Sequence, residues 1–146
     1  MDLIIELVPK SSWYSNLRSE LPKEDWDRIR RESYRKAEYK CEICGGVGPN
    51  HPVECHEIWH YDDSENIQRL DGVISLCPDC HQVKHIGLAG IVGKKEQAID
   101  HLAKVNGWPR ELAEEHVQEA FAEWARRSTK KWTLDLSWLE KQGVAS

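Results

Sequence analysis

No run of 18 apolar residues occurs in this sequence, and no basic region precedes its first apolar stretch. The opening "MDLIIELVPK" has an acidic second residue and only a short apolar run before Pro9. A signal peptide needs a basic start, and a membrane span needs about 20 apolar residues. We therefore expect neither, and predict a soluble, cytoplasmic protein that does not contact a membrane.

Positive charge does not predominate either. The 146 residues include 20 Lys and Arg against 25 Asp and Glu, which gives a formal net charge of -5. Any contact with nucleic acid must therefore come from a local basic patch. Phe and Met occur once each, whereas Trp occurs 7 times and supplies much buried area per residue. The length, with no internal repeat, predicts a single domain over residues 1–146.

The cysteines form two pairs of the C-x-x-C type. "CEIC" holds Cys41 and Cys44, and "CPDC" holds Cys77 and Cys80. Each pair can offer two thiolates to one tetrahedral zinc ion. Disulfides are the alternative, but cysteines inside cells are more often metal ligands. The pattern predicts one structural Zn²⁺ that closes the loop 45–76.

That loop contains "CHEIWH", in which His56, Glu57 and His60 spell H-E-x-x-H. On a helix this motif binds the zinc of a metalloprotease. Here the neighbouring Val53, Ile58, Trp59 and Tyr61 favour a strand. On a strand, four steps of about 3.3 Å hold the two histidines about 13 Å apart, too far to share a metal. We therefore favour a strand, and the protease remains an alternative.

The remaining pattern alternates short strands with helices. Strands are expected over residues 1–8, 52–61 and 66–76, the last with a break at Asp71–Gly72, and 131–139 alternates like a strand or an extended clasp. Helices are expected over 21–40, 77–87, 94–107 and 109–127, where Pro or Gly marks most of the ends. Residues 87–95 are expected to form a flexible connection.

The first of these helices carries a cluster of basic residues. Arg28, Arg31 and Arg35 recur at helical spacing within it. Such a helix face is either simply solvated or in contact with nucleic-acid phosphates. We take these three residues as candidate nucleic-acid ligands.

Two histidines follow the second cysteine pair. His81 and His85 are four residues apart on the expected helix and so share one face. Two imidazoles on one face can bind a second metal ion, although exposed surface histidines would give the same spacing.

The segments "CEIC", "ECHEIW" and "SLCPDCHQVKH" together resemble the HNH endonucleases of the ββα-metal superfamily. The resemblance covers residues 41–87. It implies an α+β fold, in which a small ββα-metal core with structural zinc is embedded in flanking helices, including a C-terminal extension over 94–127. By the same resemblance, His56 would be the general base and His81 and His85 would hold a catalytic divalent metal, whether Mg²⁺, Mn²⁺, Ni²⁺ or Zn²⁺.

Two positions depart from the family. Cys55 precedes His56 where the family prefers a metal-binding Asp or His, so Cys55 is either a ligand for a softer metal or a small buried residue. Asp71–Gly72 stand where the family has its middle Asn, and Asn66 is displaced. The resemblance implies metal-assisted hydrolysis of phosphodiester bonds, with DNA as the expected substrate. The alternative is a non-catalytic zinc module that binds nucleic acid or protein.

Overall fold

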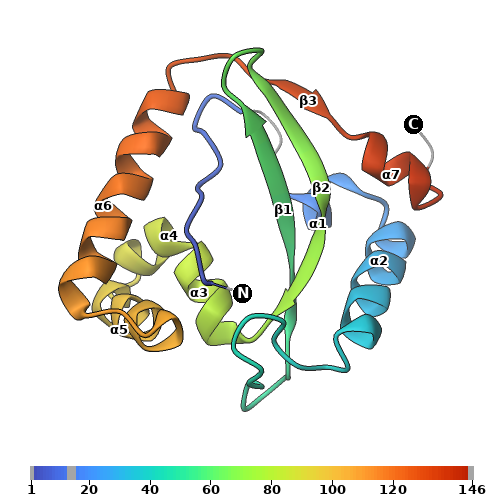
Figure 1. The fold of residues 1–146 in the computed structure, drawn as a ribbon. Helices are drawn as coiled ribbons and strands as arrows, with labels where there is room; N and C mark the ends of the chain where they lie inside the picture. Colours follow the sequence, from blue (N-terminus) through green and yellow to red (C-terminus); the bar gives the residue numbers. More distant parts are fainter. Residues whose placement is uncertain (1, 13–15, 145–146) are drawn as a thin grey trace.

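The computed structural model describes residues 2–12 and 16–144, and shows an α+β fold around one small sheet (Figure 1). The elements follow in this order: α1 (Leu17–Glu20), α2 (Lys23–Lys36), β1 (Glu54–Asp62), β2 (Ile67–Leu76), α3 (Pro78–Lys84), α4 (Ile86–Ile91), α5 (Lys95–Asn106), α6 (Arg110–Arg127), β3 (Thr133–Asp135) and α7 (Ser137–Lys141).

The sheet has the order β1-β2-β3, with β1 antiparallel and β3 parallel to β2. The expected strand break is confirmed as a bulge. Ile58 pairs with Gly72 and Trp59 pairs with Leu70, so Asp71 is left without an opposite residue. The bulge lies between the β1–β2 turn and the point where His56 pairs with Ile74.

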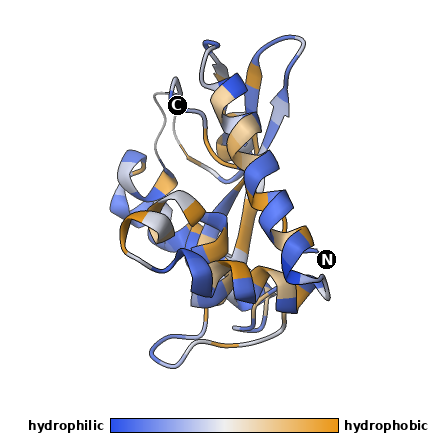
Figure 2. Ribbon diagram, turned by 90° about the vertical axis from the view of Figure 1, so that its left-hand side faces the viewer, coloured by the Kyte–Doolittle hydropathy of each residue, from blue (hydrophilic) through white to orange (hydrophobic). Residues whose placement is uncertain are grey.

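Helices cover both faces of this sheet, and each side has its own apolar cluster. Helices α3 to α6 lie on one side, and α1, α2 and α7 on the other (Figure 1). On the first side Leu76, Val83 and Leu102 are fully buried, and on the second Leu17 and Leu70 have almost no exposed surface. Helices α5 and α6 pack into the first cluster, which also contains buried cysteines of the two C-x-x-C pairs. Helix α6 carries hydrophobic and hydrophilic residues along its length (Figure 2), with Ala113, Val117 and Ala120 buried.

Some helix ends follow the sequence signals, but the helix expected over 77–87 divides at His85 into α3 and α4, so Gly87 lies inside α4. Pro78 occupies the first turn of α3, and the Cys77 sulfur caps that turn by accepting from the Cys80 N–H. Gly107 ends α5 in a left-handed conformation with φ of 65°, which glycine adopts without strain. No helix in the described residues is long and apolar enough to cross a membrane.

Two local predictions were wrong. Residues 2–8 of the expected first strand belong to no strand, because the backbone N–H groups of Leu3 and Ile5 donate to the Asn106 and His116 side chains instead of to a neighbouring strand. Residues 87–95 are not a plain connection, because most of α4 lies there with Ala89 buried against α5. The 131–139 segment is only partly extended, since β3 ends at Asp135 and α7 follows.

Candidate metal centres

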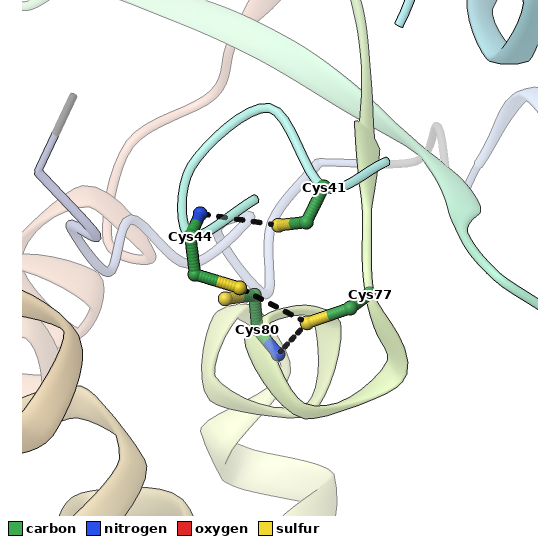
Figure 3. A group of neighbouring side chains, drawn as sticks. All are labelled: Cys41, Cys44, Cys77 and Cys80. Atoms are coloured by element: carbon green, nitrogen blue, oxygen red, sulfur yellow. Dashed lines mark hydrogen bonds between the residues drawn. The ribbon is translucent and has the colours of Figure 1, made fainter. Parts of the chain in front are cut away.

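Four cysteine sulfurs meet between the loop that precedes β1 and the start of α3. The ligand atoms of Cys41, Cys44, Cys77 and Cys80 all lie within 4.8 Å of one another. Figure 3 shows the side chains converging from the two C-x-x-C pairs. All but Cys44 are buried. Four sulfur donors in this arrangement form a site suited to zinc.

Close contacts between the sulfurs change the protonation of these thiols. The Cys80 thiol is hydrogen-bonded to Cys41, which lowers the pKa of Cys41 to about 4 and raises the pKa of Cys80. The Sγ atoms of Cys44 and Cys77 lie 3.6 Å apart. When a divalent cation binds thiolates, it replaces the protons that these closely spaced sulfurs would otherwise hold. The donor set therefore fits the predicted structural zinc.

Three histidines form a second cluster beside the first. The ligand atoms of His56, His81 and His85 also lie within 4.8 Å of one another. The Nε2 atoms of His81 and His85 are 3.0 Å apart, and the His56 ring centroid lies 5.1 Å from each of the other two. Strand β1 supplies His56, and the α3 segment supplies the other two. The structure thus brings together the three histidines that the sequence singled out.

Two of these imidazoles, those of His56 and His85, are held in the neutral form that a metal requires. Burial lowers the pKa of His56 to about 2, and the nearby imidazoles of His81 and His85 and the Lys84 ammonium lower it further. Burial likewise lowers the pKa of His85 to about 4. The Nδ1 atom of His56 is buried and, among the described residues, has no hydrogen-bond partner. An unpaired buried nitrogen next to two other imidazoles fits a metal ligand.

The position of the H-E-x-x-H residues on strand β1 shows whether His56 and His60 can share one zinc ion. Both histidines of that motif lie on β1, but His60 is exposed and is not part of the three-histidine cluster. The intervening Glu57 accepts the Leu17 N–H at 2.7 Å. The predicted strand is confirmed, and the residues do not form the single zinc site of a helical metalloprotease.

Cys55 belongs to neither metal cluster. Its side chain is buried, and burial raises the pKa of its thiol to about 12. Of the two alternatives for this position, the structure supports a small buried residue. Asn66 lies in the turn between β1 and β2, in a left-handed conformation with φ of 55°.

The histidines line a cleft of about 1580 Å³. Its other lining residues include His51, Glu54 and Lys84, and Arg30 from α2. Helix α2 itself packs on the opposite side of the sheet from α3 (Figure 1). The three candidate arginines of α2 are therefore not gathered around the histidines. Arg28 pairs with Asp25 at 3.2 Å and Arg35 with Glu32 at 2.6 Å.

Three polar residues of this cleft, Glu54, His51 and Lys84, were not predicted from the sequence. Glu54 accepts a hydrogen bond from the His81 Nδ1 at 2.9 Å, and its second oxygen lies 3.1 Å from the His51 Nε2. Lys84 lies between His81 and His85 in the sequence, and its ammonium donates to the Ile4 carbonyl. One signal was available for Glu54, because it stands two residues before His56 and so projects from the same face of the strand.

The chain matches no family model, no curated protein and no solved structure.

Proposed function

We propose that the protein is a metal-dependent endonuclease that hydrolyses phosphodiester bonds, with DNA as the expected substrate. One observation carries the proposal: three imidazoles converge beside a four-cysteine site, in an open cleft. Structural zinc sites use all their positions for protein ligands, whereas catalytic sites have three protein ligands and leave a position for water or substrate. The two clusters differ in this way.

The cysteine cluster has a supporting role in this proposal. Zinc held by the two C-x-x-C pairs would fix the start of α3, since Cys77 caps that helix and Cys80 lies within its first turn. His81 follows Cys80 directly, so its position depends on the same turn. The structural zinc therefore places two of the three histidines relative to the hairpin.

The histidine cluster would hold the catalytic divalent metal. Bound there, such an ion supplies Lewis-acid polarisation of a phosphodiester, a lowered pKa for water and neutralisation of charge on the leaving oxygen. Lys84 lines the same cleft and adds positive charge next to the histidines. Lys84 is thus one positive charge close to the proposed metal, in a cleft whose lining also includes the carboxylates of Glu54 and Glu57.

The geometry favours a ligand role for His56 over the role of general base. A general base works best with a pKa near the working pH, whereas burial lowers the pKa of His56 to about 2. A metal ligand, in contrast, must be neutral. With His81 and His85 within reach, His56 completes a set of three nitrogen donors. The base assignment stays a prediction that one variant can test.

Cleavage of plasmid DNA tests the function. Purified protein is incubated with supercoiled plasmid, single-stranded DNA and RNA, each with Mg²⁺, Mn²⁺, Ni²⁺ or Zn²⁺, and the products are resolved on gels. We expect metal-dependent nicking or cutting by the wild type and none by His81→Ala. Binding of nucleic acid without cleavage under every condition would refute the nuclease and favour the non-catalytic zinc module.

A further inference from the structure

The geometry points to Glu54 as the residue that positions His81 for metal binding; this inference rests on the proposed histidine metal centre. Glu54 and His56 project from the same face of β1, toward α3, and the Glu54 carboxylate reaches the far side of the His81 ring. The distance from Oε1 to the His81 Nδ1 is 2.9 Å. Glu54 therefore contacts the back of one candidate ligand while its strand neighbour supplies another.

The contact fixes which nitrogen of His81 carries the proton. An ionised carboxylate only accepts hydrogen bonds, so the His81 Nδ1 must be the donor. In the neutral ring the Nε2 atom is then unprotonated, and its lone pair faces the His85 Nε2, 3.0 Å away. A carboxylate behind the ring also makes the opposite nitrogen a stronger donor to a metal. The arrangement thus presents the correct atom of His81 before any ion binds.

The second oxygen of Glu54 is held as well. Oε2 lies 3.1 Å from the Nε2 of His51, in the loop before β1. Glu54 is 36% exposed and His81 22% exposed, so the pair is partly shielded from water. The hydrogen bonds to His81 and His51 lower the pKa of the Glu54 carboxyl against the opposing effect of burial. The hydrogen bond to His51 therefore limits rotation of the Glu54 carboxylate.

Metal titration tests the inference separately from cleavage. Zinc-loaded protein is titrated with Co²⁺, whose visible absorption reports binding and ligand geometry. The variants are Glu54→Ala, Glu54→Gln and, as a distant control, Asp71→Asn. We expect Glu54→Ala to weaken Co²⁺ binding about 10- to 100-fold. Glu54→Gln, which retains an acceptor oxygen but loses the charge, should bind with intermediate affinity and a shifted spectrum.

Nitrogen NMR gives a second readout that general destabilisation would not produce. In the wild type without Co²⁺, the long-range ¹H–¹⁵N spectrum of His81 should show a protonated Nδ1 and a bare Nε2. Glu54→Ala should give a mixture of tautomers, and His51→Ala a smaller change. Zinc content and circular dichroism of each variant confirm that the fold is kept.

The two proposals fail differently. If Glu54→Ala bound Co²⁺ within twofold of the wild type, or if Asp71→Asn weakened binding equally, the positioning role would be wrong and the nuclease unaffected. If the wild type bound Co²⁺ and Glu54→Ala did not, but no substrate were cleaved, the nuclease would be wrong and the positioning role upheld. A wild type that bound no Co²⁺ outside the cysteine site would overturn the inference itself.

Discussion

The cysteine cluster and the histidine cluster both take residues from α3 and its ends, yet they differ in burial and in donor atoms. The cysteine site draws its ligands from two local pairs and has three of its four members buried. The histidine site draws its members from a strand and a helix, and opens into a cleft. The first has the features of a site that stabilises the fold, and the second those of a site that can exchange ligands.

The donor atoms of the two clusters also suit a structural and an exchangeable metal ion, respectively. Thiolates bind zinc tightly and leave no free position when four are present. Three imidazoles leave room for a further ligand and accept several divalent metals. Loss of the cysteine zinc should therefore destroy both sites, whereas loss of the histidine site should leave the cysteine zinc bound. The following predictions test that asymmetry in order of expected effect.

The largest effect should come from the cysteine site. Cys80→Ser, or removal of the zinc with a strong chelator, should unfold the hairpin and α3, because a structural zinc contributes about 10 kcal/mol or more of folding free energy. Thermal unfolding followed by circular dichroism, together with elemental analysis, measures this. Cys55→Ser is the matched control and should retain one zinc per chain. A folded Cys80→Ser protein with no zinc would show that the site does not hold the fold together.

The next largest effect should come from His81 and His85. His81→Ala and His85→Ala should each abolish most metal-dependent cleavage and weaken binding of the second metal, while the cysteine zinc stays bound. The reason is that the two centres share no ligand. Calorimetric titration with Ni²⁺, with zinc content measured in parallel, checks this. Release of zinc by either substitution would mean that the ligand assignment is wrong.

His56→Ala sharpens the comparison within the histidine site. We expect a loss of cleavage of about 100-fold or more, since a positioned base alone is worth about 10²–10⁴-fold. A ligand would also lose metal affinity, whereas a base would lose rate at saturating metal and leave the affinity unchanged. His60→Ala is the control on the same strand and should keep most activity. Equal, severe losses from both substitutions would contradict the separation of the two residues along β1.

The parts of the site that were predictable are those set by local spacing. The cysteine pairs, and His81 with His85, follow from spacings of three and four residues on a turn or helix. The bulge at Asp71–Gly72 was also visible, because those residues interrupt a strand pattern. His56 was found through the family resemblance, but its distance from the helix depends on how the hairpin packs against α3. No local rule gives that distance.

The failures have a common physical cause. Residues 2–8 are apolar enough for a strand, but the backbone N–H groups of Leu3 and Ile5 are satisfied by the side chains of Asn106 and His116, over 100 positions away. Helix α4 contains Gly87 and Gly90, which argue against a helix, yet burial of Ile86 and Ala89 outweighs their low helix propensity. Glu54 was missed because its role comes from a hydrogen bond across the fold. In each case tertiary structure decides what local preference leaves open.

The smallest effect should come from the basic face of α2, which lies on the other side of the sheet from the histidines. Neutralising Arg28, Arg31 and Arg35 should lower affinity for DNA and flatten its salt dependence, because every phosphate that is no longer neutralised reduces the slope by about 0.9. Arg28 and Arg35 already have acidic partners on their own helix, so the combined change in slope should be nearer the value for one phosphate than for three.

Binding measured by fluorescence anisotropy at several salt concentrations gives the slope. Lys130→Ala, a substitution near the far end of α6, is the control for simple loss of positive charge. An unchanged slope in the triple variant would make this face of α2 an ordinary solvated surface, and would leave the cations that line the cleft, Lys84 among them, to attract the phosphate backbone.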